Sequence, residues 1–430
     1  MVAILQPPPL TKTGITKLTN CWLVTRDSTL IQSDLWVGST TGKILNSQAA
    51  FYDDFLVPEH TIDLQGRIVS PGFIDCQLNG AFGFNFSTVM DDMSLYRKEL
   101  DALNKKLLTT GVTSYLPTVT SQAGSLYHKV LPYLVPSGSA RDASVGAESL
   151  GAHVEGPFLN PHQNGIHNPS VLQSATSIID LEQTYGFNNF AYAIKMITVA
   201  PEVANMTSFI PDISSVGIIV SIGHSEATLS QATAAVEAGA TMITHLFNAM
   251  TPPHHRRPGI FGLLSSPDLT VQRPYFGIIA DGNHLHPSTV TAAWRTHPEG
   301  FILVTDAMHV LGLPDGHYSW TNGSSESSVI VKKGDLCHLE GNEEAIAGSA
   351  VPLIECVNNF MEWSGASVAE VLNTVTATPA KMLGLEGIKG SLEAGADADF
   401  VVLSFKEEEG EGRKKRLGVD EVWKFGERVV

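Results

Sequence analysis

Cysteine is scarce in this 430-residue chain, which contains only Cys21, Cys76, Cys337 and Cys356. Because they form no CxxC pair and lie far apart, a thiolate zinc site and a disulfide framework are both disfavoured. No stretch reaches the roughly 18 uninterrupted apolar residues of a membrane span. The start of the chain lacks the basic segment and long apolar core of an export signal. We therefore expect a cytoplasmic protein with no membrane partner.

Positive charge is also in short supply, because 27 lysines and arginines stand against 44 aspartates and glutamates, a formal charge of −17. Such a molecule repels polyanions, so nucleic acid is not an expected partner. A hydrophobic share of 43% and a charged share of 17% exclude disorder on composition and are typical of a globular enzyme with a large core. An anionic substrate would need a local positive field on this acidic background.

The middle of the chain alternates short apolar strands with amphipathic helices. The strand candidates are residues 69–77, 114–119, 150–157, 193–202, 217–225, 241–248, 275–282 and 301–308. Eight strands alternating with helices predict an α/β fold, a parallel (β/α)8 TIM-like barrel. Short β segments near both ends predict a small discontinuous β-sandwich domain from residues 1–70 and 385–430, around a catalytic barrel of residues 71–384.

Six of the predicted strands end in a chemically capable side chain, namely Gln77, Glu155, His224, His245, His284 and Asp306. The active sites of such barrels lie at the carboxyl ends of the strands, so we expect these side chains to converge. Glu155, His224 and His245 form a normal three-ligand set for Zn²⁺ or Fe²⁺, with a position left for water. Asp306 is then the expected general base; the alternative is a helix N-cap or a salt-bridged aspartate.

One compact basic cluster lies near a strand end, and it consists of His254, His255, Arg256 and Arg257. The planar fork of an arginine suits bidentate binding of phosphate. The alternative is a surface run paired with acidic neighbours. The cluster favours a substrate that carries a phosphate.

Six segments resemble motifs of the N-acetylglucosamine-6-phosphate deacetylases of the amidohydrolase superfamily: HVEGPFLN at 153–160, GIHNP at 165–169, SIGHS at 221–225, THLFNAM at 244–250, ADGNH at 280–284 and VTDAMH at 304–309. PGFIDCQLNG at 71–80 and GADADFVVL at 395–403 mark the superfamily more broadly. The resemblance covers nearly the whole chain. It implies a hydrolase of linear amides in amino-sugar catabolism, which converts N-acetylglucosamine 6-phosphate to glucosamine 6-phosphate and acetate.

The resemblance also implies residue roles. Glu155, His224 and His245 correspond to the metal ligands. Asp306 corresponds to the residue that activates water and later protonates the leaving amine, and His167 to a histidine that polarises the acetamide carbonyl. Substrate contacts are implied for His167 and also for Gln77, Ile166, Asn248, Ala249, His284, Ala347 and Gly348. Arg256 matches an arginine that binds the substrate phosphate, near the partner's site in a homodimer.

The end of the first strand departs from the wider superfamily. Many amidohydrolases carry His-x-His there and bind two metals, whereas this chain has Gln77 and Asn79. Amides are poor Zn²⁺ ligands beside imidazoles and carboxylates. We therefore expect one divalent ion, Zn²⁺ before Fe²⁺, with Gln77 orienting the water. Two other functions stay open, a cyclic-amide amidohydrolase and a non-catalytic barrel scaffold.

Overall fold

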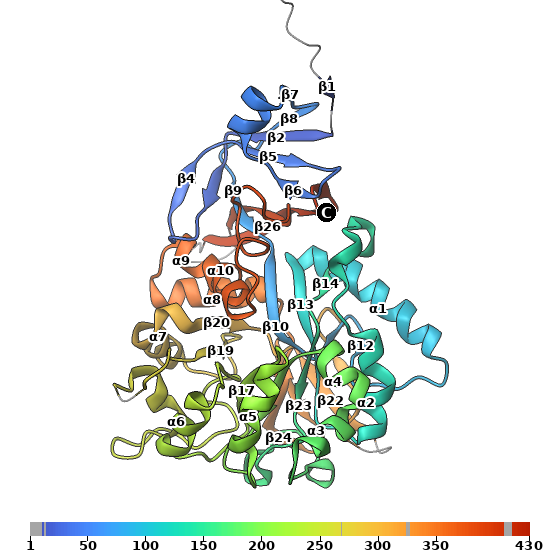
Figure 1. Cartoon of the computed structure of the whole chain (residues 1–430), viewed down its shortest axis with the longest axis vertical. Helices are drawn as coiled ribbons and strands as arrows, with labels where there is room; N and C mark the ends of the chain where they lie inside the picture. Colours follow the sequence, from blue (N-terminus) through green and yellow to red (C-terminus); the bar gives the residue numbers. More distant parts are fainter. Residues whose placement is uncertain (1–10, 13, 268, 324–326, 408–414) are drawn as a thin grey trace, which may run out of the picture.

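The computed structural model describes residues 11–12, 14–267, 269–323, 327–407 and 415–430. A barrel with its helices forms the larger, lower part of the molecule in Figure 1, and sheets from both ends of the chain lie above it. Among the described residues, no helix has the length and hydropathy to cross a bilayer. The predicted absence of an export signal concerns residues 1–10, which lie outside the described ranges.

Eight parallel strands form the barrel, each paired with the next in the chain. They are β10 (Phe73–Leu78), β13 (Val112–Val119), β15 (Ala152–Glu155), β16 (Ile194–Val199), β17 (Ile219–Ile222), β18 (Met242–Ile243), β19 (Tyr275–Ile279) and β20 (Phe301–Val304). A parallel bridge from Leu78 to Ala307 joins the first strand to the end of the last. Nearly all strand residues are buried, as expected when helices cover a parallel sheet. The predicted barrel is confirmed.

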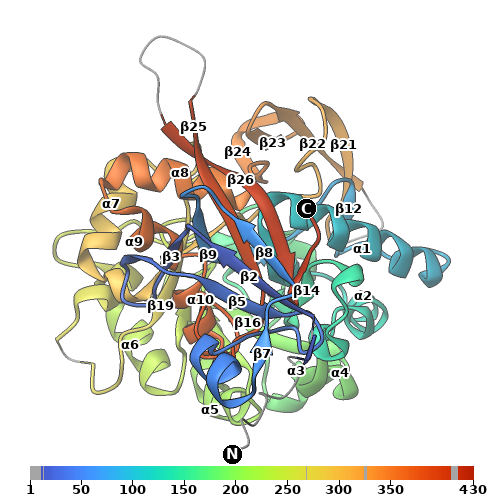
Figure 2. The ribbon, with the colours of Figure 1, turned by 90° about the horizontal axis from the view of Figure 1, so that it is seen from above.

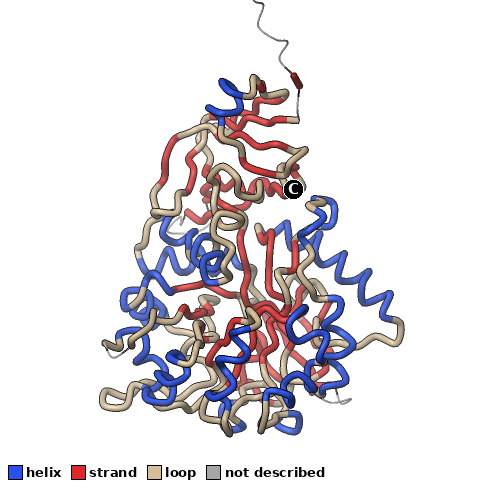
Figure 3. The backbone as a smooth tube through the Cα atoms, in the orientation of Figure 1, coloured by secondary structure: helices blue, strands red, loops and turns tan. Residues whose placement is uncertain are grey.

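Helices surround these strands, as the blue segments of Figure 3 show. They are α1 (Met93–Leu107), α2 (Gly124–Val130), α3 (Ile178–Tyr185), α4 (Phe187–Ala193), α5 (Met206–Ser215), α6 (Leu229–Glu237), α7 (Pro287–Thr296), α8 (Leu353–Ser364), α9 (Val368–Asn373) and α10 (Ala377–Met382). Their starts carry local signals: Asp92 caps α1 by accepting the Ser94 N–H, and Thr228 forms a capping box with Gln231. Helix α1 buries Tyr96, Leu100 and Leu103, whose spacing places them on one face.

Strands from both ends of the chain share one six-stranded sheet, in the order β27-β26-β25-β9-β3-β4. Its members are β3 (Trp22–Val24), β4 (Leu30–Gln32), β9 (Ile68–Pro71), β25 (Phe400–Glu407), β26 (Lys415–Lys424) and β27 (Glu427–Arg428). A second sheet, in the order β6-β5-β2-β8, holds β2 (Ile15–Thr19), β5 (Leu35–Gly38), β6 (Lys43–Ile44) and β8 (His60–Asp63). Figure 2 shows these strands crossing above the barrel. The domain limits at residues 70 and 385 stay a prediction.

Shorter elements complete the chain. A π-helix, η1 (Ala49–Asp53), precedes β7 (Leu56–Val57), which pairs with β1 (Thr11–Lys12). After β10, the strands β11 (Gly80–Ala81) and β12 (Phe84–Asn85) form a small hairpin, and β14 (Glu148–Ser149) pairs with barrel strand β13.

An antiparallel sheet of four strands, not predicted from the sequence, is inserted between β20 and α8. The strands are β21 (Gly316–Thr321), β22 (Ser327–Lys333), β23 (Leu336–Leu339) and β24 (Asn342–Ser349). Glycine-containing turns at residues 334–335 and 340–341 separate the last three strands, which is the usual signature of hairpins. We call these four strands the inserted sheet.

A buried ion cluster joins the barrel to the six-stranded sheet. Glu148 on β14 contacts Lys389, whose Nζ also lies 2.6 Å from Asp399 Oδ2 and 2.8 Å from Asp397 Oδ2. Lys424 on β26 lies 2.7 Å from the same Asp399 oxygen. Burial opposes ionisation of Asp399, but the two ammonium groups outweigh it and hold its pKa well below the usual range.

We predict that Lys389→Met lowers the free energy of unfolding by about 3–5 kcal/mol, because removing one partner of a buried ion group leaves the others uncompensated. Lys406→Met is the matched control: its 2.6 Å pair with Asp420 is exposed on the lysine side, so it should cost no more than about 1 kcal/mol. Guanidinium unfolding curves measure both losses. Equal losses in the two variants would contradict a stabilising role for the cluster.

Candidate active site

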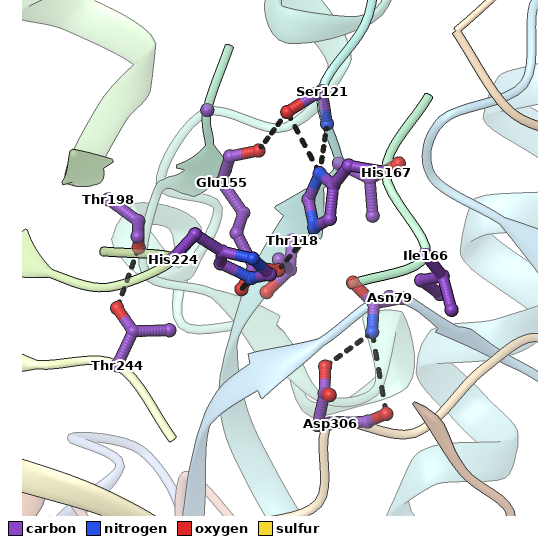
Figure 4. A network of polar contacts seen from close by, with 12 residues as sticks. Asn79, Thr118, Ser121, Glu155, Ile166, His167, Thr198, His224, Thr244 and Asp306 are labelled. Atoms are coloured by element: carbon purple, nitrogen blue, oxygen red, sulfur yellow. Dashed lines mark hydrogen bonds and ion pairs between the residues drawn. The ribbon is translucent and has the colours of Figure 1, made fainter. Parts of the chain in front are cut away.

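Three electron-donating atoms meet at the carboxyl ends of β15, β17 and β18. Glu155 Oε1 lies 3.2 Å from His224 Nε2 and 3.0 Å from His245 Nε2, and the two imidazole nitrogens are 3.1 Å apart. All three side chains are buried. Figure 4 shows Glu155 and His224 turned toward each other at the centre of this network. The expected convergence of these strand ends is therefore present.

The backbone is strained at several of these strand ends. His224 has φ 49°, His245 has φ 25° and Asp306 has φ 47°, all in the left-handed region. A residue with a Cβ pays roughly 1–2 kcal/mol for this conformation. Strain of this kind concentrates at functional sites, where the surrounding fold holds it.

The hydrogen bonds of His224 identify which of its ring nitrogens is free. Its Nδ1 lies 2.8 Å from the Gln163 carbonyl oxygen, which can only accept, so Nδ1 carries the proton. In the neutral ring Nε2 then holds a lone pair aimed at Glu155 Oε1. A carboxylate oxygen and two imidazole nitrogens this close together are the donor set that suits a divalent cation.

His167 is held as a neutral hydrogen-bond donor. The backbone N–H of Ser121 donates to His167 Nδ1 over 3.1 Å, so the ring proton resides on Nε2. That Nε2 lies 3.9 Å from Glu155 Oε2, at the rim of the donor cluster. Burial, and then the nearby His224, lower the pKa of His167 to about 3. Near neutral pH the ring therefore presents an uncharged Nε2–H toward the site, while its Nδ1 faces Ser121, as Figure 4 shows.

Asp306 is positioned by two amide side chains from β10 and the residue just after it. Asn79 Nδ2 donates to Asp306 Oδ1 over 2.7 Å, and Gln77 Nε2 donates to the same oxygen over 3.2 Å and to Glu155 Oε1 over 3.0 Å. Burial, and then the charge of Glu155, raise the pKa of Asp306 to about 6. A carboxylate with a pKa near neutrality can both accept and return a proton.

A cavity of about 240 Å³ is lined by these groups at the carboxyl ends of the barrel strands. Its lining includes the predicted substrate-contacting residues Ile166, His167, Asn248, Ala249, His284 and Gly348, together with Glu155, His224, His245 and Asp306. Gln77 is not among the residues that line the cavity, and its side chain hydrogen-bonds to Glu155 and Asp306. Ala347 is fully buried on β24, where it packs with Met308 and Trp320 in the core of the inserted sheet and does not line the cavity. Their predicted substrate contacts stay predictions.

Some lining residues were not predicted from the sequence. They are Thr120, Gly165, Glu344 and Ile346, together with Asn79, which the sequence analysis considered only as a poor metal ligand. Thr120 follows β13, whose strand is visible in the sequence, so its strand-end position was an available signal. Glu344 and Ile346 belong to β24, in the part of the chain where no strand was predicted.

His284 is fixed by the aspartate of its own motif. Asp281 Oδ1 accepts the backbone N–H groups of Asn283 and His284, each over 2.9 Å, and Asp281 Oδ2 lies 2.7 Å from His284 Nδ1. The proton between carboxylate and ring therefore resides on Nδ1. This leaves Nε2 of the neutral ring as a hydrogen-bond acceptor, and His284 lines the cavity.

Arg256 does not line this cavity in the single chain. It lines a second one, of about 500 Å³, with Thr228, His254 and Arg257 among the other lining residues. Glu226, also in that wall, receives a hydrogen bond from Gln163, the residue that holds His224. The basic cluster is thus next to the site but separate from the donor atoms.

A second group of buried carboxylates, Glu148, Asp397 and Asp399, also has ligand-like spacing. Here Lys389 and Lys424 already supply the positive charge between the oxygens. This group is an ion cluster of the fold, and a metal ion is not expected there.

A barrel with a carboxylate, imidazoles and an aspartate at its strand ends, flanked by sheets from both termini, defines an amidohydrolase. The model of the amidohydrolase family matches residues 68–429, and the chain belongs to this family. The family resemblance read from the motifs is confirmed.

The similarity to characterised relatives is narrower than the family. The N-acetylglucosamine-6-phosphate deacetylase of Danio rerio is 43% identical over 394 residues, which cover 90% of this chain and 93% of the relative. The solved deacetylase of the same name from Pasteurella multocida has a TM-score of 0.79 at 27% identity and covers 96% of this chain and 99% of that one. A variant of the Mycobacterium smegmatis enzyme, solved with N-acetyl-D-glucosamine-6-phosphate, has a TM-score of 0.77 at 25% identity, with 98% and 100% coverage.

We predict that Glu155→Gln lowers metal affinity by more than about a hundredfold, since loss of an outer-shell partner alone costs 10–100-fold. Elemental analysis after gel filtration should find about one ion per wild-type chain and little in the variant. Glu343→Gln, an exposed glutamate on β24, is the control that should keep its metal. Full metal content in Glu155→Gln would rule out this ligand set.

Proposed function

We propose that this chain hydrolyses the acetamide of N-acetylglucosamine 6-phosphate, releasing acetate and glucosamine 6-phosphate. The observation that carries the proposal is the meeting of Glu155, His224 and His245 beside Asp306 and the neutral His167 at one cavity. Relatives at 43% identity over most of the chain carry the deacetylase name. The relatives reported above carry the name of a deacetylase, so the cyclic-amide alternative gains no support.

Glu155, His224 and His245 are the residues that would hold one divalent ion, Zn²⁺ or, as the alternative, Fe²⁺. When bound, such an ion acts as a Lewis acid and lowers the pKa of water toward neutrality. Gln77 and Asn79 offer amides, which donate to Glu155 and Asp306 and leave no second ligand set on β10. This arrangement supports the proposal of one ion per chain.

Asp306 is the proton carrier in the proposed reaction. Its carboxylate, held by Asn79 and Gln77, takes the proton of the attacking water as the water adds to the acetyl carbon. It later returns that proton to the departing amine. A pKa of about 6 allows one group to perform both transfers.

His167 stabilises the charge that develops on the carbonyl oxygen. Its Nε2–H is fixed by the Ser121 hydrogen bond to the other ring nitrogen, so a donor is already in place before reaction. Because the ring is neutral, it does not compete with a cation for the Glu155 carboxylate. Asn248, Ala249 and His284 line the space in which the sugar would lie.

Arg256 would bind the phosphate from across a homodimer interface. This assignment is supported by its place in a cavity next to the site and by its match to the phosphate-binding arginine of the deacetylases. The four cysteines are free and buried, which is consistent with the proposed cytoplasmic location.

We predict that Asp306→Asn lowers kcat for acetate release by about 10²–10⁴-fold, the usual contribution of a general acid–base group. Metal content and the KM for N-acetylglucosamine 6-phosphate should stay close to wild type, because the amide keeps the size of the side chain. Retention of near-normal kcat would show that another group moves the proton.

We predict that Arg256→Ala raises the KM for the phosphorylated sugar by about tenfold or more, the effect of losing a hydrogen bond to a charged group. It should leave hydrolysis of the unphosphorylated sugar unchanged. Arg257→Ala is the matched control and should show a smaller rise.

Mixed dimers show which subunit the arginine serves. Subunits that carry Arg256→Ala are combined with subunits that carry Asp306→Asn. If Arg256 reaches across the interface, one of the two sites in each mixed dimer has both native residues, and activity should return. No recovery in verified mixed dimers would place Arg256 in its own chain's site.

A further inference from the structure

The inserted sheet is attached to the backbone that carries Asp306. Ser349 at the end of β24 donates its N–H to the Asp306 carbonyl over 3.1 Å, and its own carbonyl accepts the Met308 N–H over 2.9 Å. Gly348 makes this approach feasible: it has φ 69°, and a Cβ there would lie 2.7 Å from Met308 Cγ and 2.9 Å from the Asp306 carbonyl oxygen. The direction in which β24 leaves the site is therefore fixed by the catalytic loop.

Alternate residues of β24 face the cavity. Gly348, Ile346 and Glu344 line it, as the two-residue period of a strand requires, whereas Ala347 on the opposite face packs into the core of the inserted sheet. At about 3.3 Å per residue, Glu344 lies roughly 13 Å along the strand from Gly348. This places the Glu344 side chain at the mouth of the cavity, away from the donor cluster.

Glu344 is a carboxylate without an assigned task. Within the described residues it has no hydrogen bond or ion pair, and it is exposed at the cavity mouth. Its neighbour Glu343 points to the other face of the strand, where it is 4.0 Å from Lys333. A negative charge at the cavity mouth repels a phosphate, so the phosphate of a bound substrate must lie on another side.

We propose that Glu344 is a specificity-determining residue whose carboxylate accepts a hydrogen bond from a ring hydroxyl of the substrate. The inference rests on the proposed function. When the acetamide lies at Asp306 and the phosphate points away from the negative Glu344, the uncharged edge of the sugar ring faces β24. A carboxylate can only accept, and the hydroxyls at C1, C3 and C4 are the donors on that ring.

The test measures kcat/KM for acetate release from N-acetylglucosamine 6-phosphate and from its 1-deoxy, 3-deoxy and 4-deoxy analogues. In the wild type, one analogue should lose about tenfold or more in kcat/KM, mostly through KM, because its hydrogen bond to a charged acceptor is lost. Glu344→Ala should remove this penalty, and Glu344→Gln, which keeps a neutral acceptor, should restore part of it. Glu343→Gln changes the same charge on the opposite face and should keep the wild-type pattern.

Equal losses for all three analogues in the wild type and in Glu344→Ala would overturn the inference while leaving the deacetylase activity in place. A wild-type protein that releases no acetate from the parent sugar would instead overturn the proposed function, and the inference with it.

Discussion

The approach of the Glu155 carboxylate to the His224 and His245 imidazoles, with all three donor atoms 3.0–3.2 Å apart, is the constraint on which the rest of the site depends. These residues come from three different strands, so the approach exists only because the barrel curves. It also requires the left-handed backbone at both histidines, which the fold must stabilise. A divalent cation would relieve the repulsion between these electron-donating atoms. The neighbouring Asp306 and His167 could then take part in a reaction beside it.

Charge is distributed so that an acidic chain can still accept an anion. The net charge of −17 disfavours the approach of a sugar phosphate at long range, so local positive groups at the site must offset it. A cation at the donor cluster and Arg256 in the adjacent cavity would supply positive charge, whereas Glu344 at the mouth would repel the phosphate from one side. Far from the site, Lys389 and Lys424 neutralise the buried carboxylates that join barrel and sheet, so those carboxylates do not form a second metal site.

The sequence predicted the barrel and the meeting of Glu155, His224 and His245, because each follows an apolar strand and parallel strands end at one face. It could not predict that Ser121 fixes the tautomer of His167, since this bond joins loops 46 residues apart. The inserted sheet had hairpin signals, but its position over the cavity depends on the attachment of Ser349 to the Asp306 backbone. Likewise, the sequence showed a basic cluster at Arg256 but not that it lines a separate cavity.

The central claim is that one metal ion at the Glu155, His224 and His245 cluster enables deacetylation of a sugar phosphate. The most direct measurement is acetate release from N-acetylglucosamine 6-phosphate by metal-stripped protein as Zn²⁺ is added back in known amounts. The account predicts no release without metal and a linear rise that saturates at one equivalent per chain. Full activity without metal, or saturation only at two equivalents, would contradict it.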